Sequence, residues 1–118
     1  MKIMKKPAVT VFGLGRMGAQ IARRLHKNGF KVVAWNRSPE PVREVKKSGM
    51  FATNDLGEAV GRITDTTQKC SMPRIFWVML PHKITREFIL GRGHLGGHLK
   101  KGDIVIDGGN SFYKESME

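Results

Sequence analysis

Cysteine and long hydrophobic runs are nearly missing from this chain. Its 118 residues include one cysteine, Cys70, which cannot form an internal disulfide and is typical of a protein in a reducing compartment. The longest apolar run, from Ile75 to Leu80, is far shorter than the roughly 18 residues that a membrane-spanning helix needs. These absences predict a cytoplasmic protein without a membrane partner.

Acidic residues are also scarce, since 21 Lys and Arg stand against 10 Asp and Glu, for a net charge of +11. The excess is concentrated, because 12 basic and two acidic residues precede residue 48. Such a charge suggests nucleic acid, but the basic third offers only Phe12, Phe30 and Trp35 as stacking aromatics, mostly at strand positions. We therefore expect no nucleic-acid partner and a surface that receives a smaller anion.

Strand signals alternate with helix signals over a length that suits one domain. We expect strands at residues 8–12, 31–35, 50–53, 74–80 and 103–107, and helices from 17 to 28, 39 to 48, 54 to 60 and 84 to 90. Residues 61–72 lack a clear period and are predicted as helix end plus loop, and residues 91–102 as loop with at most a short helix. The alternation predicts an α/β fold, a Rossmann-type doubly wound parallel sheet in a single domain, with ligands bound beyond the carboxyl ends of the strands.

A glycine motif directly follows the first expected strand and opens the first helix. It reads Gly13, Leu14, Gly15, Arg16, Met17, Gly18. In a GxGxxG motif the first glycine permits the tight turn, the second lets a pyrophosphate approach the backbone, and the third allows the helix to pack on the strand. The phosphates would accept hydrogen bonds from the helix N-terminus. A ligand-free turn and another nucleotide-like ligand, such as S-adenosylmethionine, are the alternatives.

The residues after the second strand bear on the choice of cofactor. A carboxylate there would bind the adenine ribose 2′-hydroxyl and repel a 2′-phosphate, but this chain has Asn36, Arg37 and Ser38. Arg37 can pair with a phosphate and Ser38 can donate a hydrogen bond to it, which favours NADP over NAD. The alternative is that Arg37 is only solvated and Ser38 only caps the next helix.

Two further groups of polar residues are candidates for a site. Asp107 to Ser111 follows the last strand, and its paired glycines would bring the Asn110 amide close to a ligand, unless the segment is a simple turn capped by Ser111. His94 and His98 have the spacing of a metal pair but no third ligand at a useful spacing, so we expect no metal site.

The segments GLGRMG, WNRS, RIFWVMLP and GDIVIDGGNSFYKES together resemble the N-terminal coenzyme-binding domain of 6-phosphogluconate dehydrogenase. That family catalyses an oxidative decarboxylation in the pentose phosphate pathway. The resemblance runs from about Pro7 to the end of the chain. The related β-hydroxyacid dehydrogenases share the glycine loop and a similar MLP turn, but usually have a Ser/Thr-rich loop in place of Gly108 to Ser111.

The resemblance implies a role for each matching residue. Gly13 to Gly18 would contact the pyrophosphate, Asn36, Arg37 and Ser38 would hold the 2′-phosphate side, Met79, Leu80 and Pro81 would lie near the nicotinamide half, and Asn110 would contact both cofactor and sugar-phosphate substrate. Leu80 departs from the lysine of many NADP-dependent members, and the MLP form also occurs in members that use NAD, so NAD remains the alternative cofactor.

In that family the catalytic lysine and glutamate come later, in a helical domain, and none of these 118 residues matches them. We therefore expect the chain to be a truncated cofactor-binding domain of a homo-oligomeric enzyme, able to bind cofactor but not to turn over substrate. A β-hydroxyacid dehydrogenase domain of the 3-hydroxyisobutyrate type and a non-catalytic dinucleotide-binding module are the alternative functions.

Overall fold

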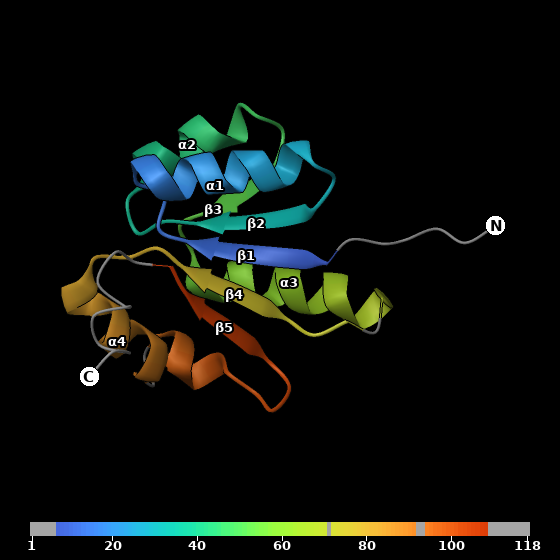
Figure 1. The fold of residues 1–118 in the computed structure, drawn as a ribbon, viewed down its shortest axis with the longest axis vertical. Coiled ribbons are helices and arrows are strands. Elements are labelled where there is room, and N and C mark those ends of the chain that lie inside the picture. Colours follow the sequence, from blue (N-terminus) through green and yellow to red (C-terminus); the bar gives the residue numbers. More distant parts are fainter. Residues whose placement is uncertain (1–6, 71, 92–93, 109–118) are drawn as a thin grey trace.

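The computed structural model describes residues 7–70, 72–91 and 94–108. These residues form a five-stranded parallel sheet with helices on both faces (Figure 1). The strands are β1 (Ala8–Phe12), β2 (Lys31–Trp35), β3 (Phe51–Thr53), β4 (Ile75–Val78) and β5 (Ile104–Asp107). The helices are α1 (Arg16–Lys27), α2 (Pro39–Lys46), α3 (Leu56–Cys70) and α4 (His82–Leu90), with a short 3₁₀ helix, η1 (Leu95–His98), before β5.

The order of the strands reverses at β1. The sheet runs β3-β2-β1-β4-β5, so the chain moves outward from β1 to β3 and then crosses back to place β4 on the other side of β1. This arrangement confirms the predicted Rossmann-type doubly wound sheet. The point of reversal, between the carboxyl ends of β1 and β4, is where ligands bind in such sheets.

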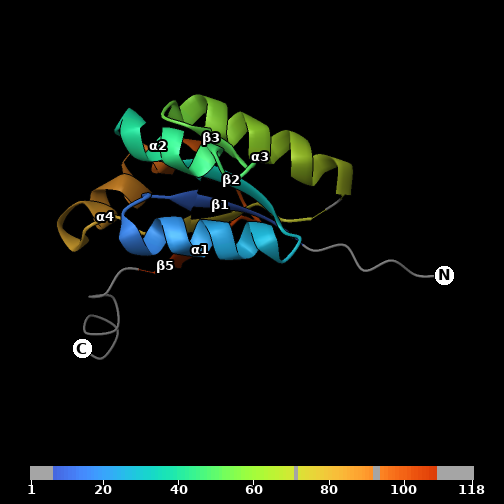
Figure 2. The same ribbon diagram turned by 90° about the horizontal axis from the view of Figure 1, so that it is seen from above.

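The two faces of the sheet bury separate hydrophobic clusters because strand side chains alternate in direction. In β1, Val9 and Val11 face the helices α1 and α2, whereas Ala8 and Phe12 face α3, α4 and η1. Figure 2 shows α1 and α3 on opposite sides of β1. With both faces covered, all five residues of β1 are buried, which explains its unbroken apolar sequence.

An aromatic cluster lies beneath the start of the glycine motif. The Phe12 ring centre is 5.2 Å from that of Phe88 and 5.8 Å from those of Trp35 and Phe76. Aromatic pairs at such distances contribute about 0.5–1.5 kcal/mol beyond the area they bury. The cluster joins the carboxyl ends of β1 and β2 to β4 and α4, so it holds the edge that carries the candidate site.

The expected end of the third helix was wrong. Residues 61–72 were predicted as helix end plus loop, but α3 continues to Cys70. Its threonines obscured the helical period, yet Thr64, Thr66 and Thr67 donate their hydroxyls to the carbonyls of the residues four positions earlier, at 2.7 to 2.9 Å. Their polar groups are thus satisfied within the helix itself.

The residues that α1 buries are not the large apolar residues that recur along it. Met17, Ile21 and Leu25 recur every four residues, but the buried residues are Gly18 and Ala22, and Met17 is 54% exposed. Small side chains lie against the sheet because the helix starts immediately beside β1 and approaches it closely. Among the described helices, none is both long and apolar enough to cross a lipid bilayer.

Candidate functional site

The glycine motif forms the turn between β1 and α1 at the carboxyl edge of the sheet. Gly13 has a φ of +99°, which L side chains rarely adopt, and a Cβ there would lie 2.7 Å from the Met79 carbonyl oxygen. A Cβ on Gly18 would lie 1.9 Å from the Gly13 carbonyl oxygen. Both glycines are therefore required by the packing of the turn against β4 and of α1 against β1.

Gly15 differs from these two glycines, because a Cβ there would meet no protein atom within 4 Å. It is the N-cap of α1 and supplies no side-chain cap for the first turn. The first amides of a helix have no partner within the helix, and this turn contains no acidic residue. Open space, free amides and the positive end of the helix dipole fit the pyrophosphate of a dinucleotide.

The side chain of Asn36 joins the glycine motif to the loop after β2. Its Oδ1 accepts a hydrogen bond from the Leu14 amide at 2.8 Å, and its Nδ2 donates to the Ser38 carbonyl oxygen at 3.2 Å. The Asn36 amide also donates to the Thr53 carbonyl oxygen at the end of β3, at 3.2 Å. Sequence reasoning placed Asn36 beside a 2′-phosphate and missed these contacts.

Arg37 and Ser38 directly follow Asn36 in the chain, and both are exposed. Ser38 occupies the N-cap position of α2, but its hydroxyl makes no capping hydrogen bond, so capping does not account for it. A hollow of about 790 Å³ lies between α1 and α2 and is lined by Gly15, Arg16 and Ser38, with Glu40 and Arg43 among its other residues. The structure thus brings the glycine motif and Ser38 to one open cavity.

Met79, Leu80 and Pro81 follow β4 on the other side of the glycine motif. The Met79 amide donates to the Phe12 carbonyl oxygen at 2.7 Å, and the Thr85 hydroxyl lies 2.9 Å from the carbonyl oxygens of both Leu80 and Pro81. Thr85 therefore closes the turn into α4. The structure places these three residues at the switch point, next to Gly13.

Gly108 follows β5 and fits closely against β4. Its amide donates to the Val78 carbonyl oxygen at 2.9 Å, and a Cβ there would lie 2.3 Å from Trp77 Nε1 and 2.5 Å from Met79 Sδ. The glycine is thus needed for the close approach of β5 to these side chains. Asn110 and Ser111, the candidates for ligand contact and helix capping, lie outside the described residues.

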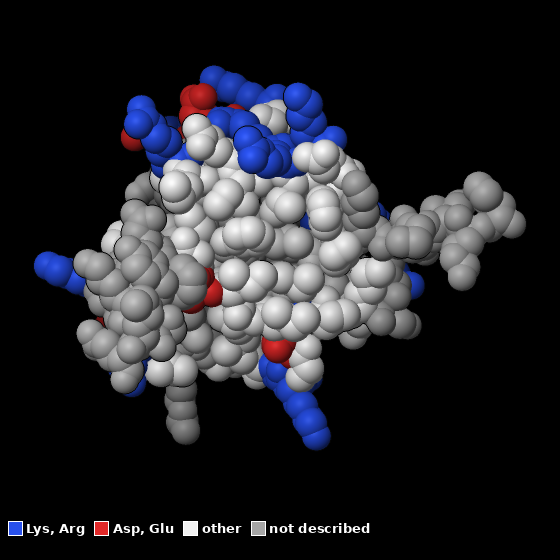
Figure 3. All heavy atoms as spheres, viewed as in Figure 1, with Lys and Arg blue, Asp and Glu red and all other residues white. Residues whose placement is uncertain are grey.

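Positive charge gathers on the side of the molecule that carries α1 and α2. Figure 3 shows Lys and Arg side chains over these helices and a largely uncharged face below them. The basic residues of the two helices include Arg16, Arg23, Arg24, Lys27, Arg43 and Lys46. Arg16, Arg23 and Arg43 line the hollow beside Ser38, so part of this charge faces the candidate site.

The model of one known protein family matches nearly the whole chain. Residues 8–118 match the family model described as the NAD binding domain of 6-phosphogluconate dehydrogenase. The chain belongs to this family.

Curated relatives of the family include enzymes named for either cofactor. The decarboxylating 6-phosphogluconate dehydrogenase of Haemophilus influenzae is 35% identical over 112 residues, covering 94% of this chain and 22% of that protein. The NAD(+)-dependent enzyme of Haloferax volcanii is 33% identical, covering 91% of this chain and 33% of the relative, and the NADP(+)-dependent enzyme of Bacillus subtilis is 32% identical, covering 97% and 23%. The chain therefore spans a third or less of the length of these relatives.

Solved structures of imine reductases share the fold of this 6-phosphogluconate dehydrogenase family domain. An imine reductase from Pseudomonas sp. superposes with a TM-score of 0.62 at 24% identity, over 95% of this chain and 36% of that one. A variant from Myxococcus stipitatus in complex with NAD+ gives 0.61 at 19% identity, over 95% and 34%. At these identities the likeness concerns the fold alone.

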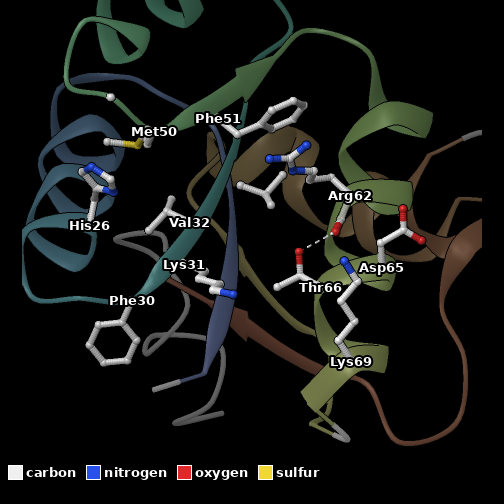
Figure 4. A pocket seen from close by; sticks show the side chains of 12 residues that line it. His26, Phe30, Lys31, Val32, Met50, Phe51, Arg62, Asp65, Thr66 and Lys69 are labelled. Carbon is white, nitrogen blue, oxygen red and sulfur yellow. Dashed lines mark hydrogen bonds between the residues drawn. The ribbon is translucent and has the colours of Figure 1, made fainter. Parts of the chain in front are cut away.

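A second hollow, of about 500 Å³, lies at the opposite edge of the sheet (Figure 4). It is lined by the start of β2 and β3, by the last turn of α1 and by the middle and end of α3, including His26, Lys31, Arg62 and Lys69. The Arg62 guanidinium lies 4.6 Å from the centre of the Phe51 ring. Lys69 lies in the last turn of α3, where a cation complements the negative end of the helix dipole. This hollow is separate from the glycine motif and is not part of the candidate cofactor site.

The histidine pair does not resemble a metal centre. His94 lies before η1 and its ring centre is 6.0 Å from that of Phe88, while His98 ends η1. Within the described ranges, no three His, Cys, Asp or Glu side chains are grouped closely enough to hold a metal ion.

Proposed function

We propose that this domain binds NADP for an enzyme that converts 6-phosphogluconate to ribulose 5-phosphate by oxidative decarboxylation, a reaction of the pentose phosphate pathway. Membership of the family and relatives that carry this name support the substrate class. Relatives of both cofactor types are similarly distant, so the choice of NADP depends on this chain's own residues.

The loop after β2 carries the choice of NADP. No carboxylate is present at positions 36 to 38, where one would bind the ribose 2′-hydroxyl of NAD. The exposed Arg37 guanidinium and the Ser38 hydroxyl, which makes no capping hydrogen bond, are instead donors in this loop, and Ser38 lines the same hollow as Gly15. Two possible donors and no carboxylate at these positions suit a 2′-phosphate.

In the proposed reaction the C3 hydroxyl of the substrate loses its proton to a base and C3 loses a hydride. The carboxylate of the resulting β-keto acid leaves as carbon dioxide, and the carbon it leaves is protonated. When bound, the nicotinamide takes up the hydride. The described residues bind and orient the dinucleotide through the turn from Gly13 to Gly18, with Met79, Leu80 and Pro81 along its nicotinamide half.

Three parts of this proposal concern the whole enzyme. Asn110 contacts cofactor and substrate together, the acid and base groups come from chain beyond these 118 residues, and the enzyme is a homo-oligomer. Under this proposal the domain alone binds cofactor without turning over substrate. A full-length protein that oxidises 3-hydroxyisobutyrate and leaves 6-phosphogluconate unchanged would instead be a β-hydroxyacid dehydrogenase, which Leu80 in the MLP turn favours as the second candidate.

Replacing Arg37 tests the choice of cofactor. Arg37→Ala should weaken NADP binding by about 10- to 100-fold, because a charged hydrogen bond contributes about 1.5–3 kcal/mol, and should change NAD binding little. Isothermal titration of the domain with each cofactor measures both. Arg24→Ala, at an exposed arginine near the far end of α1, is the control and should affect neither. Equal losses of NAD and NADP in Arg37→Ala would show that Arg37 does not contact the 2′-phosphate.

A further inference from the structure

Asn36 stands at the junction of the two loops that form the candidate cofactor site. Its side chain bonds the glycine motif through the Leu14 amide and the following loop through the Ser38 carbonyl oxygen. Its backbone amide is fixed to β3 by the bond to Thr53. One residue thus ties three segments of the sheet edge together.

The directions of these bonds determine what Asn36 holds in place. The bond to Leu14 spans 22 residues of sequence and restrains the glycine motif between Gly13 and the open Gly15. The bond to Ser38 is local and restrains the loop that presents Arg37 and the Ser38 hydroxyl. The side-chain oxygen and nitrogen of Asn36 are therefore both engaged by the protein before any ligand arrives.

We propose that Asn36 is a positioning residue that fixes the spacing between the turn for the pyrophosphate and the loop for the adenine ribose. This inference rests on the proposed dinucleotide binding and assigns Asn36 a role different from direct contact with the 2′-phosphate. NAD and NADP share the pyrophosphate and the ribose, so both depend on this spacing. Loss of the Asn36 amide therefore weakens both cofactors, and NADP at least as much as NAD, because the restrained loop also carries Arg37 and Ser38.

Two substitutions separate the positioning role from direct recognition. Asn36→Ala removes both side-chain bonds and should weaken NAD by about tenfold and NADP by at least that factor, since each bond contributes modestly. Asn36→Asp keeps an acceptor for the Leu14 amide, but it loses the donor to the Ser38 carbonyl oxygen and adds a negative charge beside Arg37 and Ser38. It should bind NAD more tightly than Asn36→Ala does, while NADP remains weak.

Hydrogen exchange at the Leu14 amide supplies a readout independent of affinity. Exchange should be faster in Asn36→Ala and close to wild type in Asn36→Asp, because only the alanine variant lacks the acceptor. Asn54→Ala is the matched control, since Asn54 follows β3 at the same sheet edge and is exposed. It should leave the affinities and the exchange of Leu14 unchanged.

The experiment titrates the wild type and each variant with NAD and with NADP, after urea denaturation has verified that each is folded. If Asn36→Ala is unfolded, Asn36→Asp and its Leu14 exchange still test the proposed bond. Loss of NADP affinity in Asn36→Ala with an unchanged NAD affinity would mean that Asn36 acts only on the 2′-phosphate, and unchanged binding of both cofactors would remove its role; either result overturns the inference while leaving dinucleotide binding intact. A wild-type protein that binds neither cofactor overturns the proposed function and this inference with it.

Discussion

Thr10 is a polar residue in the middle of the buried strand β1. Its side chain is fully buried, between Val33 of β2 and Phe76 of β4 in the register of the sheet. Among the described residues its hydroxyl has no hydrogen-bond partner. An unpaired buried polar group costs about 1–3 kcal/mol, so Thr10→Val should raise the free energy of unfolding by about 1 kcal/mol. The measurement is a higher urea midpoint with an unchanged slope.

Thr67 of α3 provides the matched control for this prediction. It is also buried, but its hydroxyl donates to the Ile63 carbonyl oxygen at 2.8 Å. Thr67→Val loses that bond and should bring no gain in stability. A Thr10→Val variant no more stable than the wild type would contradict the reading of Thr10 as unpaired.

At the scale of the secondary-structure elements, one buried ion pair joins the amino ends of β4 and β5. Arg74 donates to both carboxylate oxygens of Asp103, at 2.9 and 2.6 Å, and the two side chains are 9% and 8% exposed. Arg74 also donates to the Thr64 hydroxyl on α3 and to the His98 carbonyl oxygen of η1. The pair thus connects two strands, a helix and the η1 segment.

Removing one partner leaves a buried charge unpaired, which typically costs about 3–5 kcal/mol. Asp103→Asn and Arg74→Met should each lower the free energy of unfolding by about that amount. The double variant should cost less than the sum of the two, because no unpaired charge remains. Additive losses in urea denaturation would show that Arg74 and Asp103 are not coupled.

The Arg74–Asp103 ion pair also predicts how the stability of the fold depends on pH. Burial raises the pKa of Asp103, but the hydrogen bonds from Arg74 and the Lys100 amide outweigh it and hold the pKa below its usual value. A carboxylate with a lowered pKa stabilises the fold fully above its unfolded pKa of about 3.9, and this contribution is lost as the pH falls through the folded pKa. The urea midpoint of the wild type should therefore fall below about pH 4 by more than that of Asp103→Asn. Asp65→Asn, at an exposed carboxylate, should retain the wild-type profile.

At the scale of the whole molecule, the uneven charge predicts a salt dependence of cofactor binding. The Debye length falls from about 10 Å at 0.1 M salt to about 3 Å at 1 M. NADP carries an additional phosphate, so its affinity should fall more steeply with salt than that of NAD. Titrations across this range measure both slopes.

One arginine and one lysine substitution show whether the salt dependence of NADP binding comes from charges near the site. Arg43→Gln, in the hollow beside Ser38, should reduce the salt slope for NADP. Lys27→Gln lies at the other end of α1, about 16 Å from Arg16 at 1.5 Å per residue, and should change it little. Equal effects would mean that the total charge of the chain, and not its placement, attracts the cofactor.

Local patterns in the sequence were sufficient for the architecture. Apolar β-branched strands, a GxGxxG turn and helix-ending glycines each act within a few residues, so they predicted the alternating elements and the parallel sheet. The threonines of α3 misled this reasoning, because their bonds to helix carbonyls cannot be distinguished by composition from the turns that threonine also favours.

The sequence by itself thus determined the Rossmann-type fold, its family and the absence of a carboxylate after β2. Only the tertiary structure decided that Asn36 reaches Leu14, that Arg74 pairs with Asp103 and that Gly108 fits against Trp77. The physical reason is sequence separation. Turn and helix preferences are set by neighbouring residues, whereas these contacts join residues 22 to 31 positions apart and form only when β1, β2, β4 and β5 lie in one sheet.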